Sequence, residues 1–229
     1  MNSSYVIGTG WWCDGTGKQM GSGRNSSSDE IRKEGFFYLW NRYINKFTDP
    51  YRIVVVDSAS PVRPKVHEQK YAERYVWRLL ANNPGHGKGW WKGVIESAKW
   101  AHRKKKDYIY VEQDCLVYGV GWVERCLSHA RESTGILLGR GDGTPQPIQQ
   151  SLMVVTADKL EDFISGISNY KGDDGVPNEV MFQKNLDFDW LPIHGGRARP
   201  IKWNLPFWYA QHFTDEELKK VKNTADEWE

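Results

Sequence analysis

Apolar residues along the chain alternate between the spacing typical of strands and the spacing typical of helices. The run at 52–56 is continuous and β-branched, as expected for a strand covered on both faces. Before it, apolar residues between positions 30 and 47 recur every three or four residues, which predicts a helix that Asp29 can cap. A shorter apolar run at 5–7 comes first and stops at Gly8. Strand, helix and strand in this order are the opening of an α/β sheet.

The rest of the chain continues this alternation. Residues 58–81 are predicted to be irregular and partly helical. Further helices are predicted at 90–103, 122–131, 157–167 and 214–228, with a short one beginning near Pro177, and further strands at 108–111, 116–118, 135–138, 151–156 and 190–193. Loops rich in glycine or polar residues are predicted at 13–28, 82–89, 139–147 and 194–200. Since no repeat or linker interrupts the pattern, we expect one domain over residues 1–229, with helices flanking a central, mostly parallel sheet.

Composition narrows the classes of protein that fit this pattern. Lysine and arginine (31) nearly balance aspartate and glutamate (29), so no stable nucleic-acid partner is expected. No apolar run reaches the length of a membrane span and no signal-peptide pattern precedes the first strand, so no integral membrane association is expected. Three cysteines without CxxC spacing suggest reduced thiols and a cytoplasmic location. The 12 tryptophans favour a carbohydrate partner mildly, because core burial explains most tryptophans equally well.

The most informative segment is the acidic pair that follows the predicted strand at 108–111. Glu112 and Asp114 are one residue apart, and alternate side chains of an extended chain share a face. Two carboxylates on one rigid edge suit Mg²⁺ or Mn²⁺, which leave coordination positions for the phosphate oxygens of a substrate. An ordinary solvated strand end is the alternative explanation. The position favours a site, since ligands of open α/β sheets bind beyond the carboxyl ends of the strands.

With these motifs, the chain resembles GT-A-fold glycosyltransferases, which carry a DxD-type motif and use nucleotide-diphospho-sugars. The resemblance runs from Tyr5 to about His212, and it departs from the usual motif in having glutamate as the first acid. It implies a nucleotide-binding half at 1–118 and an acceptor-binding half at 119–229. It also implies that four regions contact the nucleotide. These are the end of the first strand (Thr9, Gly10 and Trp11), the acid that closes the second strand (Asp57), the helix after the glycine-rich turn (Lys92) and the first acid of the pair (Glu112).

The resemblance further implies a third metal ligand late in the chain, beside Glu112 and Asp114. His194 opens the segment His-Gly-Gly-Arg-Ala-Arg-Pro-Ile-Lys-Trp, which loosely resembles a segment of glycogenin-like transferases. His212 is the rival candidate. Cationic side chains of the same region would neutralise a leaving diphosphate: Arg197, Arg199 and Lys202.

An inverting transfer needs a carboxylate that takes the proton of the acceptor hydroxyl. Glu179 lies where such enzymes often carry this base, and Asp174 and Asp173 compete for the role. Each of the three could instead cap a helix or a turn. The predicted function is therefore metal-dependent, inverting transfer of a sugar from a nucleotide-diphospho-sugar to an acceptor hydroxyl.

Two other functions stay open at this point. A Rossmann-type methyltransferase would use Gly8, Gly10 and Asp57, although the pattern lacks the third glycine of a dinucleotide fingerprint. A non-catalytic carbohydrate-binding protein would use exposed tryptophans and would be indifferent to metal.

Overall fold

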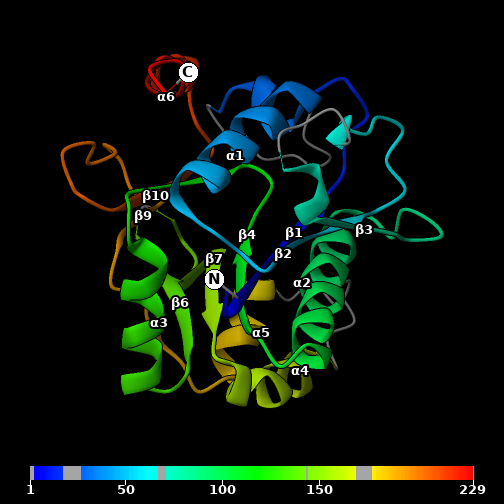
Figure 1. Cartoon of the computed structure of the whole chain (residues 1–229), viewed down its shortest axis with the longest axis vertical. Coiled ribbons are helices and arrows are strands. Elements are labelled where there is room, and N and C mark those ends of the chain that lie inside the picture. The colour runs from blue at the N-terminus through cyan, green and yellow to red at the C-terminus, as the bar shows by residue number, and fades with distance from the viewer. Residues whose placement is uncertain (1–2, 18–26, 67–70, 143, 169–176, 229) are drawn as a thin grey trace.

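The computed structural model describes residues 3–17, 27–66, 71–142, 144–168 and 177–228, and it has the α/β fold that the sequence predicts (Figure 1). A seven-stranded sheet has the order β3-β2-β1-β4-β7-β6-β8. Its strands are β1 (Tyr5–Trp11), β2 (Arg52–Asp57), β3 (Tyr75–Leu79), β4 (Asp107–Val111), β6 (Ile136–Arg140), β7 (Ile148–Val155) and β8 (Asp189–Trp190). Only β7 runs antiparallel to its neighbours, so the sheet is mostly parallel.

A second, three-stranded sheet continues from the carboxyl end of β4. It has the order β5-β10-β9, with β5 at Cys115–Tyr118, β9 at His194–Gly196 and β10 at Trp208–Gln211. Strand β10 pairs antiparallel with β5 and places Gln211 opposite Cys115. This pairing brings the end of β10 beside the acidic pair, 97 residues earlier in the chain at Asp114.

Neighbouring residues of each strand point to opposite faces of the large sheet, and helices cover both faces. Ile7 of β1 joins a core formed with α1 (Glu34–Phe47), α3 (Trp122–Glu132) and α6 (Asp215–Asp226). The adjacent Val6 joins the opposite core, formed with α2 (His86–Arg103), α4 (Leu160–Ser168) and α5 (Asn178–Asn185). Figure 1 shows α6 lying next to α1. Within the described residues, no helix combines the length and apolar character needed to cross a membrane.

Helix α2 passes very close to β1, and glycines permit this approach. A Cβ atom on Gly93 would lie 3.0 Å from the Cα atom of Gly10, and one on Gly8 would lie 2.5 Å from the Ser97 hydroxyl. Larger side chains at these positions would push the helix off the sheet. The second turn of α2, which ends at Gly93, therefore lies directly over the end of β1.

Several predicted boundaries were wrong. Strand β1 continues through Trp11 rather than ending at Ile7, because its residues from Val6 to Trp11 pair with β2. The helix predicted from residue 30 is a short 3-10 helix (Asp29–Arg32) followed by α1, and the side chain of Ser28, not of Asp29, accepts the capping hydrogen bond from Glu30 N–H.

Four strands were also missed or displaced. Strand β3 lies in the stretch predicted to be irregular, and β9 lies in a predicted loop. The strand predicted at 190–193 is instead β8, which ends at Trp190, and β10 was not predicted. These strands are only two to five residues long, too short to show a clear apolar alternation.

All three cysteines lie in described residues, are buried and form no disulfide. Burial raises the pKa of Cys126 to about 12, and burial also raises the pKa of Cys13 and of Cys115. Since the thiolate is the reactive form, we expect the native protein to react negligibly with Ellman's reagent at pH 8. In denaturant all 3 thiols should react. Rapid modification of a thiol without denaturant would show that this thiol is accessible in the native protein and not buried.

Candidate functional site

A cleft opens at the carboxyl ends of β1, β2 and β4, beneath the first turns of α2. The space between its walls is about 740 Å³, a volume that includes open solvent at its mouth. Its walls come from five parts of the chain: Gly10, Trp11 and Trp12; Arg32; Ser58; Asn83, Gly85, Gly89 and Trp90; and Tyr110, Glu112, Gln113 and Asp114. The acidic pair thus lies in the cleft, where the sequence predicts a site.

A tight turn after β4 sets the direction of the acidic side chains. The Cys115 N–H donates to the Glu112 carbonyl at 2.9 Å. The side chain of Gln113 forms two hydrogen bonds with the backbone of Trp12, accepting from its N–H at 2.7 Å and donating to its carbonyl at 3.1 Å. Gln113 therefore ties β4 to the end of β1, while Glu112 and Asp114 both face β10.

The two carboxylates converge on one amide group. Gln211 Nε2 donates to Glu112 Oε2 at 2.8 Å and to Asp114 Oδ1 at 3.1 Å. The other oxygen of Asp114 lies 3.6 Å from an Arg32 guanidinium nitrogen and 3.6 Å from His212 Nε2. A compact polar cluster is formed by Glu112, Asp114, Gln211, His212 and Arg32.

This environment shifts the pKa values of two members of the cluster. Burial, followed by the nearby charge of Asp114, raises the pKa of Glu112 to about 8. Burial, with the positive charges of Arg197 and Arg32 adding to it and Asp114 opposing it, lowers the pKa of His212 to about 4. At neutral pH the imidazole of His212 is therefore uncharged, and the surroundings favour the protonated form of Glu112.

The donor chemistry of this cluster suits a divalent ion. Two carboxylates and a neutral imidazole are ligands that Mn²⁺ accepts, and two oxygens of the pair already point at one position, that of the Gln211 amide nitrogen. In the described part of the chain, no group of three or more His, Cys, Asp or Glu side chains is already arranged around a metal position. The residues fit a metal through the carboxylate pair, with the remaining ligands supplied from outside or by movement of His212.

The two candidate histidines lie in different surroundings. His212 follows β10 and contacts Asp114, whereas His194 opens β9 and pairs in register with Trp208. Burial and the neighbouring charge of Lys202 lower the pKa of His194. Among the described residues, no hydrogen bond or ion pair joins His194 to Glu112 or Asp114. The structure therefore brings His212, rather than His194, to the acidic pair.

The three cationic side chains predicted to lie near the diphosphate occupy different places in the structure. Arg197 donates to Gln211 Oε1 at 3.3 Å and so lies behind the carboxylate pair. Arg199 donates to the carbonyls of Gln211 and His212 at 2.7 and 3.2 Å and pairs with Glu217 of α6 at 2.7 Å, which makes it a support of the cluster. Lys202 is exposed beside His194 and does not line the cleft.

Of the residues predicted to contact a nucleotide, Gly10 and Trp11 line the cleft with Glu112. Thr9 is buried inside β1, and Lys92 is half-buried on α2 outside the cleft wall. The Trp11 ring packs edge-on against Phe37. The half-buried Trp12 is the more available ring at the cleft wall.

Asp57 is fully buried at the end of β2 and has three protein partners. It accepts from Ser60 N–H at 2.8 Å and from the Trp77 indole at 3.4 Å, and it pairs with Arg63 at 2.7 Å. These bonds hold the loop that carries Ser58 against the cleft. Asp57 itself is not part of the cleft wall.

Glu179 lies half-buried in the first turn of α5. Its negative charge is one of the smaller causes, after burial and Asp114, of the raised pKa of Glu112, although Glu179 is not part of the cleft wall. Asp173 and Asp174 lie outside the described residues.

Two members of the cluster were missed from the sequence, Arg32 and Gln211. In the sequence, Arg32 resembles any charged residue near the start of a helix. Gln211 belongs to a strand that was not predicted. The adjacent His212 was the one available signal for this region.

The Gly8-Thr-Gly10 segment lies inside β1. A methyl-donor or dinucleotide site would need these glycines in a loop that opens a helix. The segment therefore does not form the turn that the methyltransferase alternative requires.

No family model matches the sequence, and no curated protein matches it. Solved structures share its fold. TarS 1–349 from S. aureus superposes with a TM-score of 0.54 at 14% identity, over 97% of this chain and 64% of the TarS chain, so this chain spans less than two thirds of that length. The same protein with UDP and with UDP-GlcNAc gives TM-scores of 0.53 and 0.52. A protein from Bacillus anthracis described as a glucose-1-phosphate thymidylyltransferase, in complex with sucrose, gives 0.51 at 9% identity over 97% of this chain and 94% of its own. This chain therefore has a GT-A-like fold.

Proposed function

We propose that this protein is a metal-dependent glycosyltransferase that moves a sugar from a nucleotide-diphospho-sugar to an acceptor hydroxyl. The observation that carries the proposal is the carboxylate pair Glu112 and Asp114 in the cleft at the end of β4. The shared fold with TarS, which has been solved with UDP and UDP-GlcNAc, supports a nucleotide-sugar as the donor. We keep the division into a donor half (1–118) and an acceptor half (119–229) as part of the proposal.

The base and ribose of the donor would lie along Gly10, Trp11 and Trp12, at the carboxyl end of β1. Ser58 and Asn83 line the same part of the cleft and offer hydrogen bonds. Asp57 would act indirectly, since its three protein partners hold the Ser58 loop in place. Thr9 would shape the strand from within the core, and Lys92 would approach a ligand only after a change of side-chain conformation.

The diphosphate would lie at the carboxylate pair. Asp114 and Glu112 would hold Mn²⁺ or Mg²⁺, with His212 as the third protein ligand in place of His194. A divalent ion there would supply positive charge to the leaving nucleoside diphosphate. Arg32 and Arg197 would add to this stabilisation from the protein side.

Glu179 would act as the base for the acceptor. Its carboxylate would take the proton of the acceptor hydroxyl while that oxygen bonds to the anomeric carbon and the bond from this carbon to the diphosphate breaks. Attack from the face opposite the leaving group inverts the anomeric centre. Asp174 stays an alternative base in the same proposal.

Calorimetric titration of the protein with UDP, GDP and dTDP, each with and without Mn²⁺, tests the proposal. We expect one nucleotide to bind, at least about tenfold more weakly without Mn²⁺. Binding of the methyl donor without metal would favour a methyltransferase, and glycan binding that is indifferent to Mn²⁺ would favour a non-catalytic carbohydrate-binding protein. Failure of all three nucleotides to bind a folded protein would overturn the proposal.

A further inference from the structure

The amide of Gln211 lies at the point where the two site carboxylates meet. Its nitrogen is 2.8 Å from Glu112 Oε2 and 3.1 Å from Asp114 Oδ1, and the residue is 1% exposed. The amide NH₂ group has two N–H donors, so it can satisfy one oxygen of each of the two carboxyl groups at once. A metal ion that bridges the same two oxygens would need the space that this nitrogen fills.

The surrounding structure holds the amide in this orientation. Arg197 donates to the Gln211 carbonyl oxygen Oε1 at 3.3 Å, which directs the nitrogen towards the carboxylates. Arg199 donates to the backbone carbonyl of Gln211 at 2.7 Å and is itself fixed by Glu217 at 2.7 Å. Glu217 also completes the capping box of α6. The placement of the amide is therefore built into β10 and α6 rather than left to a loose side chain.

We propose that Gln211 is an internal placeholder of the cation site: its amide bridges Glu112 and Asp114 when no cation is present and has to leave when a divalent cation bridges them. Cation affinity is then set by a competition inside the protein. The inference rests on the proposed function, since that function places the cation at this pair. It goes beyond that function because it assigns to Gln211 a role in controlling when a cation binds to the site.

Mn²⁺ titration of the full chain without nucleotide tests this role, with free Mn²⁺ measured by electron paramagnetic resonance. Gln211→Ala removes both hydrogen bonds that compete with the cation, so we expect it to bind Mn²⁺ about tenfold more tightly, or better, than the unaltered protein. Gln211→Glu adds a third carboxylate and should bind more tightly still. Gln183→Ala, an exposed glutamine on α5, is the matched control and should bind as the unaltered protein does.

Circular dichroism checks that each variant is folded, and the Mn²⁺-dependent rise in melting temperature gives a second measure of binding. If Gln211→Ala does not fold, Gln211→Glu provides the comparison. Equal or weaker Mn²⁺ binding by folded Gln211 variants would overturn the placeholder. If nucleotides bind but the Gln211 variants do not gain Mn²⁺ affinity, the proposed function survives and the placeholder fails. If no nucleotide binds while the variants gain Mn²⁺ affinity, the placeholder survives and the proposed function fails.

Discussion

Replacing Asp114 by alanine is expected to weaken Mn²⁺-dependent nucleotide binding by about a hundredfold or more, because it removes a direct ligand rather than an outer support. Asp114 is 4% exposed and meets Gln211, Arg32 and His212, so it is the most connected acid of the cluster. Its loss would leave only Glu112 and His212 to bind the cation. Calorimetry with the nucleotide that binds best, at saturating Mn²⁺, measures the effect.

Asp187→Ala is the matched control for this prediction, because Asp187 is an exposed acid just after α5 and outside the cleft wall. The control variant should bind the nucleotide as tightly as the unaltered protein. Release of nucleoside diphosphate from a donor sugar, with water as the acceptor, provides a second readout and should fall in parallel with binding. Undiminished metal-dependent binding by folded Asp114→Ala would place the cation elsewhere.

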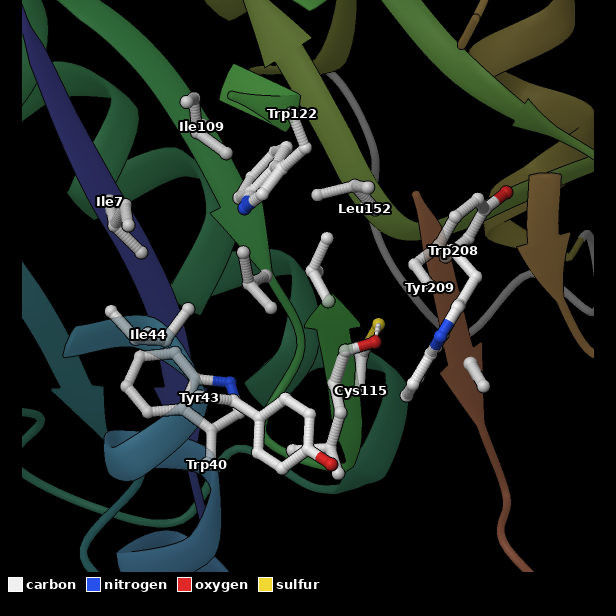
Figure 2. Close-up of a cluster of buried hydrophobic side chains, with 14 of the residues drawn as sticks. Ile7, Trp40, Tyr43, Ile44, Ile109, Cys115, Trp122, Leu152, Trp208 and Tyr209 are labelled. Atoms are coloured by element: carbon white, nitrogen blue, oxygen red, sulfur yellow. Dashed lines mark hydrogen bonds between the residues drawn. The ribbon is translucent and has the colours of Figure 1, made fainter. Parts of the chain in front are cut away.

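The second large effect is expected for Trp122→Ala, which should lower the free energy of unfolding by about 3–5 kcal/mol. Trp122 is the first residue of α3 and is 0% exposed, in the same core as Ile109 of β4 and Leu152 of β7 (Figure 2). Truncation would leave a cavity that the rigid sheet cannot close. Urea unfolding followed by circular dichroism measures the change.

Trp122→Phe separates packing from polarity at the same position. The indole nitrogen of Trp122 is buried and has no hydrogen-bond partner among the described residues, so phenylalanine removes an unsatisfied donor while filling most of the volume. We expect it to cost no more than about 1.5 kcal/mol, as for conservative core substitutions. Equal losses for the alanine and phenylalanine variants would mean that the indole nitrogen makes an interaction the structure does not show.

Local patterns in the sequence determined the elements whose burial is continuous or strongly periodic. Strand β2 and helix α3 were predicted within a residue or two, because each carries its own apolar signal. The sequence also predicts the place of the acidic pair, because Glu112 directly follows a buried strand. The direction of the two side chains is set by the turn from Glu112 to Cys115, not by the alternation of an extended strand. The mostly parallel α/β fold followed from the order of these elements.

Tertiary structure decided the partners of the acidic pair. Strand β10 is four residues long and is defined by its antiparallel pairing with β5, which no local spacing can reveal. That pairing brings Gln211 and His212 to Asp114, while β9 carries His194 into a different environment. The sequence predicts that Asp57 binds the ligand, but in the folded chain its carboxylate contacts Ser60, Trp77 and Arg63. Residue type and spacing are local properties, whereas the partner of a side chain depends on contacts between segments that meet only in the folded chain.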